Sequence, residues 1–284
     1  MDGTTPHISE AQRPAVSRFG ERRFGAVNWL GMRTLYMREI RRFMKVATQT
    51  IFAPVVSAIL FLLVFDQAFA DSRPAINGVP FLEFLAPGLI MMAVATNAFS
   101  NSSSSLIGSK MQGSIVDVLM PPMAASELTI AYVAGAATRG LLVGIVTAAT
   151  AALYMAFTDT PMSVASIGAI AYFSIIAAIM FGALGVVGGI WAEKFDHLAA
   201  ITNFFITPLT FLSGTFYAVT RLPEPFRTVS EWNPMYFLVD GLRSGFTGVA
   251  ESNLLLGGIV TLALAAAFCF WAFALFRSGY NLKA

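Results

Sequence analysis

The chain has 284 residues, of which 56% are hydrophobic and only 12% are charged, and its formal net charge is +2. Soluble domains carry about 25% charged residues, so this composition excludes an ordinary soluble protein and indicates one that lies in lipid. A nucleic-acid-binding function is excluded as well, because it needs a basic face on a soluble domain.

Six apolar runs are long enough to cross a membrane, since about 20 apolar residues span the hydrocarbon core as an α-helix. We therefore predict an all-α polytopic membrane protein with a six-span domain over residues 46–284. The predicted spans are residues 46–65, 82–106, 129–157, 163–191, 198–219 and 254–276.

The distribution of Lys and Arg predicts the orientation of these spans. Nine of the eighteen basic residues precede the first span, which places the N-terminus in the cytoplasm by the positive-inside rule. Six spans return the C-terminus to the same side, where Arg277 and Lys283 lie. Thirteen basic residues then fall in inner segments and four in outer ones, while Arg139 lies within a span.

The segment before the first span is predicted to have two parts. Residues 1–25 are polar and are expected to form a disordered cytoplasmic tail. Residues 26–45 predict an interfacial amphipathic helix whose basic side faces lipid headgroups. Its apolar stripe is Trp29, Met32, Tyr36, Ile40 and Phe43, and its polar face is Thr34, Arg38, Arg41, Arg42 and Lys45. This helix either seats a cytoplasmic partner or simply anchors the chain.

Polar residues inside the second and third spans are candidates for a site. The second span ends in the run 97–105, NAFSNSSSS, which includes Asn97 and Asn101. Such residues avoid lipid, so they either bond to neighbouring helices or line a wet cavity. Arg139, in the middle of the third span, either holds helices together or contacts substrate, and Glu127 is a candidate partner three turns away.

The fourth and fifth spans carry weaker signals. Gly185 and Gly189 are spaced as a GxxxG pair, which predicts a close approach of two helices. Asn203, in the fifth span, is a further polar residue for packing or for a transport path.

Residues 214–253 are too apolar for an ordinary loop and too interrupted to span. They predict two short outer re-entrant helices, whose backbone must be buried in protein. Asn233 followed by Pro234 is typical of an N-cap and a first helical residue. Asp240 and Arg243 are three residues apart and are expected to pair.

The inner loop after the second span predicts a short amphipathic helix, closed by the prolines that follow Met120. We expect Ser114 to cap it, one side to rest on the membrane domain and the other to meet a partner. Ile115, Val118 and Leu119 share one face of it, and Ser114 and Asp117 share another. The segment consists of Gly113, Ser114, Ile115, Val116, Asp117, Val118, Leu119 and Met120.

Several kinds of chemistry are missing from the sequence. It contains no GxxxxGK[ST] phosphate loop, so ATP is not expected to bind this chain by that route. One cysteine and two histidines do not make a metal cluster, and no catalytic nucleophile–base set is evident. We therefore predict neither an enzyme nor a metal site.

Several motifs resemble those of type-2 ABC transporter permeases, the membrane subunits of bacterial exporters. The inner loop resembles the family's loop after the second span, and the resemblance covers about residues 30–280. The segments that carry it are Gly113-Ser114-Ile115, Asp117, Leu119-Met120 and Pro122-Met123 in the loop, FLAPGLIMM from Phe84, PLTFLSGTFY from Pro208, Leu222-Pro223, and WNPMYFLVDGLR from Trp232 to Arg243.

The resemblance implies the remaining expectations. Two copies of the permease form the path in the inner membrane, with the first and fifth spans near their interface, and two separate ATPase subunits bind ATP and Mg. Residues 113–120 would be the coupling helix that docks on the ATPase. The implied cargo is an amphiphile: a lipid-linked glycan, a lipo-oligosaccharide, a lipid or a hydrophobic drug. Val116 and Gln112 depart from the family pattern, which often has an acidic and a basic residue there.

The hypothesis is therefore the membrane subunit of an ATP-driven exporter. The alternatives are a membrane scaffold or assembly protein without transport activity, and a membrane-embedded lipid-modifying enzyme.

Overall fold

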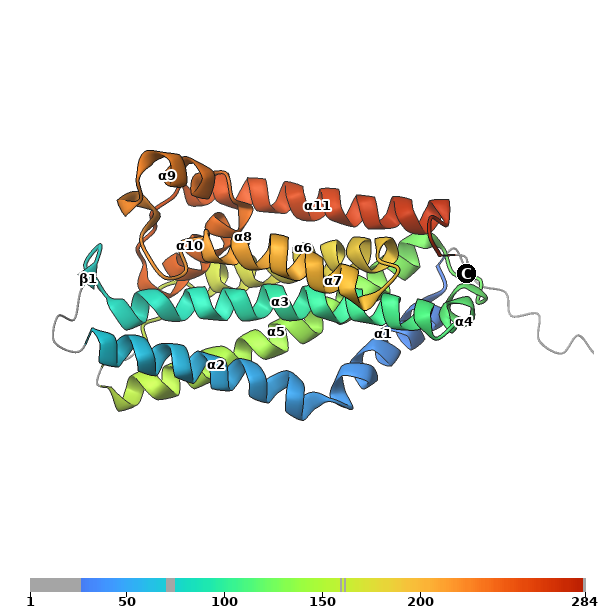
Figure 1. Ribbon diagram of the computed structural model, residues 1–284, viewed down its shortest axis with the longest axis horizontal. Coiled ribbons are helices and arrows are strands. Elements are labelled where there is room, and N and C mark those ends of the chain that lie inside the picture. The colour runs from blue at the N-terminus through green and yellow to red at the C-terminus, as the bar shows by residue number, and fades with distance from the viewer. Residues whose placement is uncertain (1–26, 70–74, 159, 161, 283–284) are drawn as a thin grey trace, which may run out of the picture.

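The computed structural model describes residues 27–69, 75–158, 160 and 162–282, so the predicted tail over residues 1–25 lies outside the described residues. Long helices run side by side along the molecule, α7 and α8 lie beside them, and α4, α9 and one hairpin lie toward its ends (Figure 1). The helices are α1 (Trp29–Met44), α2 (Ala47–Ala68), α3 (Phe81–Met111), α4 (Ile115–Leu119), α5 (Ala125–Phe157), α6 (Ile167–Trp191), α7 (Phe195–Ile201), the π-helical η2 (Thr202–Ile206), α8 (Thr207–Phe211), the 3-10 turn η3 (Val219–Arg221), α9 (Glu224–Glu231), α10 (Pro234–Thr247) and α11 (Leu254–Ser278), and the antiparallel hairpin is β1 (Ala75–Ile76) with β2 (Val79–Pro80).

Five of these helices, α2, α3, α5, α6 and α11, are long and apolar enough to cross a membrane. Each corresponds to one of the predicted spans, so the chain is an all-helical, multi-pass membrane protein.

The remaining predicted span, residues 198–219, differs from the expectation. Helix α7, η2 and α8 form one helical segment that ends at Phe211. Pro208 has no N–H, and its ring crowds the carbonyl four residues earlier. The helix widens just before it, where Thr207 N–H bonds to Thr202 O, and such π-turns relieve this kind of conflict. The chain then turns through Gly214, at φ +73°.

Helix α3 is the centre of the bundle. In its apolar stretch 72% of the residues are buried, against 17% for α2 and 22% for α11. It packs mainly on α5 and α6, and α10 also packs on it, with Arg243 bonded to Phe84 O near its first residue. The peripheral helices α2 and α11 keep large apolar side chains on the outside, including Phe52, Leu255 and Phe270, as expected for surfaces that face lipid.

The close contact of α6 with α3 depends on glycine, as the GxxxG spacing predicted. A Cβ on Gly189 would lie 2.9 Å from both Leu106 Cβ and Ser103 O, and one on Gly185 would clash with Ser102 Oγ and Phe99 O. At Gly185 the contact with Phe99 O is with a backbone carbonyl, so a change of side-chain rotamer cannot remove that clash.

We predict that Gly185→Ala destabilises the protein by about 1–3 kcal/mol, the usual cost of overpacking. Thermal unfolding of the purified full chain in detergent measures this. Gly168→Ala is the matched control, because Gly168 begins the same helix in open space and alanine is the better helix former. An equal effect of both substitutions would contradict the packing explanation.

Candidate functional site

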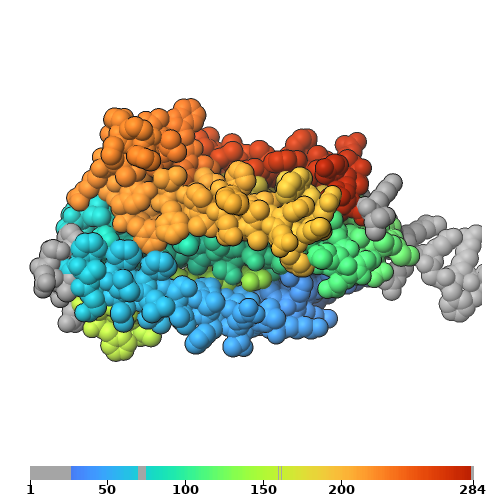
Figure 2. Space-filling view, viewed as in Figure 1, coloured from blue at the N-terminus to red at the C-terminus, as the bar shows by residue number. Residues whose placement is uncertain are grey.

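An open cleft of about 850 Å³ lies between α2 and the α7–η2 segment, with α3 as its floor. The space-filling view shows this side of the molecule, where α3 is visible between α2 and the α7 region (Figure 2). Helix α2 contributes a wall whose apolar part is Ala53, Pro54, Ala58 and Phe61 and which also holds Gln49, Thr50 and Ser57. The floor is apolar at Leu89, Met92 and Ala93 and becomes mostly polar further along α3, at Thr96, Asn97, Ser100, Ser103 and Ser104. The cleft therefore offers apolar and polar surfaces side by side.

The polar run of α3 serves both purposes that were left open, on different faces of the helix. On the packed face, Ser102 Oγ donates to Gly182 O of α6 at 2.7 Å, and Ser105 Oγ donates to Glu39 of α1 at 2.7 Å. On the other face, Asn97 and Ser100 line the cleft. Successive residues of a helix point about 100° apart, so one run reaches both surroundings.

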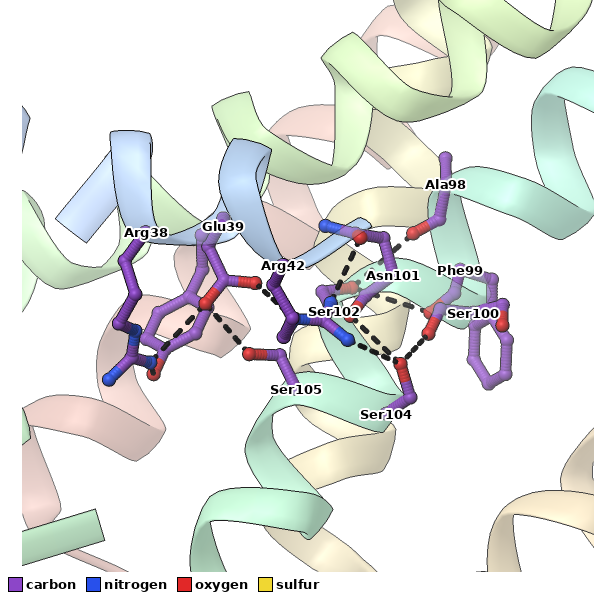
Figure 3. A network of polar contacts seen from close by, with 11 residues as sticks. Arg38, Glu39, Arg42, Ala98, Phe99, Ser100, Asn101, Ser102, Ser104 and Ser105 are labelled. Atoms are coloured by element: carbon purple, nitrogen blue, oxygen red, sulfur yellow. Dashed lines mark hydrogen bonds and ion pairs between the residues drawn. The ribbon is translucent and has the colours of Figure 1, made fainter. Parts of the chain in front are cut away.

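A charged network joins α1 to the inner half of α3 and to α5 (Figure 3). At its centre is Glu39, whose side chain is fully buried. Its carboxylate lies 3.2 Å from Arg42 Nε and 3.3 Å from Arg38 Nη2. Arg42 also donates to the backbone O and side-chain Oδ1 of Asn101, at 2.6 and 2.9 Å. Arg38 donates to the hydroxyl of Tyr132 at 3.0 Å.

This network shows which face of α1 packs on the bundle. Arg38 and Arg42 were expected to face headgroups, but both reach the buried Glu39, whereas Trp29, expected on the apolar side, is 70% exposed. A buried carboxylate needs charged or hydrogen-bonding partners, and that requirement decides which face of α1 packs. Burial lowers the pKa of Arg38, but Tyr132 and Glu39 outweigh it, so the pKa lies above its ordinary value.

Sequence reasoning missed Glu39 and Tyr132. The available signal was one acidic residue within a basic helix, with arginines one position before and three positions after it. Such spacing is typical of an ion pair on one helix face, although it does not say that the pair is buried.

Arg139 reaches the cleft from α5. Its Nη2 lies 3.5 Å from Asn97 Oδ1, and its Nε is buried without a hydrogen-bond partner. The candidate partner Glu127 is engaged elsewhere: its two oxygens accept from the N–H groups of Asn28 at 2.6 Å and Ala124 at 2.9 Å. Asn203, also proposed for a path, is exposed on η2 and does not line the cleft.

The predicted inner helix is α4. Gly113, at φ +70°, turns the chain from α3 into it, a conformation that glycine adopts without steric cost. Ile115 and Val118 are buried, in a cluster with Leu106 and Leu128. The side chains of Val116, Asp117, Leu119 and Met120 are exposed.

Two details of α4 differ from expectation. Ser114 does not cap the helix; its hydroxyl donates to Ser109 O at 3.4 Å. Leu119 was expected to share a face with Ile115 and Val118, but it is 37% exposed whereas those two are buried. At 100° per residue, Leu119 lies at the edge of the stripe that those two residues define. The exposed surface of α4 therefore carries the apolar side chains of Val116, Leu119 and Met120 beside Asp117.

The two short helices predicted in residues 214–253 are α9 and α10. Asn233 caps α10, with its Oδ1 accepting from Met235 N–H at 2.9 Å, and Pro234 is the first helical residue, as predicted. The amide of Asn233 also donates to Leu209 O at 2.7 Å, which ties α10 to α8.

The expected pair of Asp240 and Arg243 is not formed. Asp240 accepts from the backbone N–H groups of Glu251 and Ser252. Arg243 donates to Phe84 O at 3.1 Å and Gly214 O at 2.7 Å, and its guanidinium stacks on the Phe84 ring. Both charges are buried among groups from other segments, and those groups satisfy them in place of each other.

Comparison with known proteins identifies this architecture. Residues 31–247 match the family described as ABC-2 type transporter. This chain belongs to the ABC-2 type transporter family. The inner membrane transport permease YadH of Escherichia coli K12 is 32% identical over 255 residues, which are 90% of this chain and 98% of YadH. Nodulation protein J of Rhizobium leguminosarum bv. viciae is 25% identical over 234 residues, which are 82% of this chain and 87% of that protein.

The resemblance drawn from the inner loop and the outer segment is thereby confirmed. As an ABC-2 permease, the chain is a membrane transport component and not the catalytic subunit. The match begins within α1 and ends at the last residue of α10, so it includes the cleft, the charged network and α4.

We predict that Glu39→Ala destabilises the permease by about 3 kcal/mol, because it leaves the partly buried Arg38 and Arg42 without their carboxylate. Thermal unfolding of the full chain in detergent measures the loss. Glu39→Gln should lose less, since it can still accept from Ser105. Arg33→Ala, on the exposed side of the same helix, is the control. If Glu39→Ala unfolds at the same temperature as this control, the network does not stabilise the fold.

Proposed function

We propose that this permease is the membrane half of an ATP-driven exporter, which moves an amphiphile out of the cytoplasm or the inner leaflet. The observation that carries the proposal is the cleft. A hydrocarbon tail fits against the apolar part of the α2 wall, and a polar head fits over the hydroxyl and amide groups of α3. A path for ions or for a small polar solute has no need of that apolar surface.

The proposal includes six spans in the bacterial inner membrane, with both termini in the cytoplasm. Besides the five long helices, the remaining span, fifth in chain order, is the segment α7–η2–α8. It covers residues 195–211 and at 1.5 Å per residue is about 25 Å long. Helices α9 and α10 are then re-entrant from the outside. The burial of α10 supports this, because backbone at membrane depth must be covered by protein. YadH is itself named an inner membrane permease.

Two copies of the permease and two ATPase subunits complete the proposed exporter. The sequence has no phosphate loop, so ATP and Mg belong to the ATPase. Phe204 and Phe205 on η2 are 76% and 64% exposed beside the open cleft, and a second copy placed there would close the cleft into a path. The exposed surface of α4 is the proposed docking site for the ATPase.

We predict that Asp117→Arg combined with Leu119→Asp lowers the affinity of the permease for its ATPase subunit at least tenfold. The double variant reverses one charge and puts another into an apolar contact, and both changes are unfavourable in a complementary interface. Co-purification and permease-stimulated ATP hydrolysis are the measurements.

The matched control for this prediction is Arg227→Glu with Val229→Asp, which makes similar changes on the exposed surface of α9. It should leave both measurements unchanged. If the α4 variant still binds the ATPase and still stimulates ATP hydrolysis, the docking proposal is wrong.

We further predict ATP-dependent transport by the complex in reconstituted vesicles. A fluorescent-tailed amphiphile in the leaflet that the ATPase faces should move to the opposite leaflet on addition of ATP and Mg. A complex whose ATPase has lost its catalytic carboxylate is the control. If the chain were only a membrane scaffold, the bound ATPase would still hydrolyse ATP, but no amphiphile would move. ATP hydrolysis without movement would therefore favour the scaffold over the exporter.

A further inference from the structure

Arg139 is an arginine whose charge the described part of the chain does not neutralise. No carboxylate among the described residues lies within 4.0 Å of it. Its one hydrogen bond is the long contact with Asn97, and its buried Nε has no partner. A buried donor without a partner is costly, so the folded protein maintains an unfavourable arrangement at the wall of this cleft.

A second copy of the chain does not supply the missing carboxylate either. The sequence has no Asp or Glu in residues 40–65, 84–116, 128–158, 160–192, 197–223 and 252–284. These segments contain the five long helices except for their ends, together with the part of the α7–η2–α8 segment that follows Asp196. Any copy of this chain packed across the cleft therefore presents only neutral or basic side chains at the depth of Arg139.

The surroundings of Arg139 favour an anion further. Arg42 lines the same cleft. Arg42 and Arg38 share the single carboxylate of Glu39, so this ion-pair cluster carries two positive charges and one negative charge. Ser100 and Gln49 also line the cleft, and neither side chain is engaged in a hydrogen bond with another described residue. The cleft thus combines excess positive charge with unused donors, which is what a phosphate or carboxylate group requires.

From this we infer that Arg139 is the centre of an anion-binding subsite, which takes the phosphate or carboxylate head of the amphiphile while its tail lies against α2. The inference rests on the proposed function, since it names the chemical class of the cargo. It also decides between the two roles left open for Arg139, because an arginine that only held helices together would have its donors satisfied by protein carbonyls, as those of Arg243 are.

The test is ligand binding to the purified full chain, by titration calorimetry in a neutral detergent. The probes are dioctanoyl phosphatidic acid, dioctanoylglycerol, which has the same tails without the charge, and inorganic phosphate. We expect the wild type to bind phosphatidic acid at least tenfold more tightly than dioctanoylglycerol. Arg139→Gln should abolish that preference, and Arg139→Lys should retain most of it.

Two further variants make the result decisive. Arg227→Gln removes a positive charge on α9, where the side chain is 41% exposed and does not line the cleft, and should keep the preference. Ser100→Asp places a carboxylate in the cleft and should abolish the preference even if Arg139→Gln does not fold. A wild type without preference, or an Arg139→Gln variant that folds and keeps it, overturns the subsite. Inorganic phosphate binding as tightly as phosphatidic acid overturns the assignment to an amphiphile head.

The binding experiment uses the permease without its ATPase, so its outcome is independent of export. If anion preference is present and ATP-driven movement in vesicles is absent, the exporter proposal fails and the subsite stands. If movement is present without anion preference, the subsite fails and the exporter stands.

Discussion

The whole bundle depends on one constraint, which is that the polar side chains of α3 cannot be left in lipid. Hydroxyl and amide groups surrounded by hydrocarbon need partners from protein or water. Ser102 finds the carbonyl of Gly182, which requires α6 to approach closely and explains the glycines on that helix. Ser105 and Asn101 find the charged pair Glu39 and Arg42, which fixes α1. The neighbours of α3 are thus placed by what they offer to it, and the polar groups without such a neighbour form the floor of the cleft.

Much of this could be predicted from the sequence, because the signals were local. Apolar runs of about 20 residues gave the five long helices, and the glycine spacing gave the contact between α6 and α3. Asn233 followed by Pro234 gave the start of α10, and Gly113 with the later prolines gave the limits of α4. Each of these depends on a few consecutive residues and on backbone properties that hold in any surroundings.

The misses depended on contacts between distant segments. Glu39 is buried because it meets Ser105 and two arginines at once, and its partner on α3 is 66 residues away. The pairing of Asp240 with Arg243 failed for the same reason, since loop amides and distant carbonyls satisfied each residue separately. The end of the fifth predicted span at Phe211 follows from a conflict at Pro208 that hydropathy does not register. Competition for polar partners between distant segments is the common cause of the misses at Glu39 and at Asp240 and Arg243.

The arrangement also bears on how a docked ATPase would act. Helix α3 is continuous from the hairpin to Met111, so the floor of the cleft and the turn into α4 belong to one stiff element. Ile115 and Val118 pack with Leu106 of α3 and Leu128 of α5, and Glu39 joins α1 to the same region. If the ATPase binds α4, a displacement there is carried by packed side chains to α3 and α5 together, and these two helices hold Asn97 and Arg139. A change at the docking surface would therefore alter the distance between Asn97 and Arg139, the two polar groups that line the cleft on these helices.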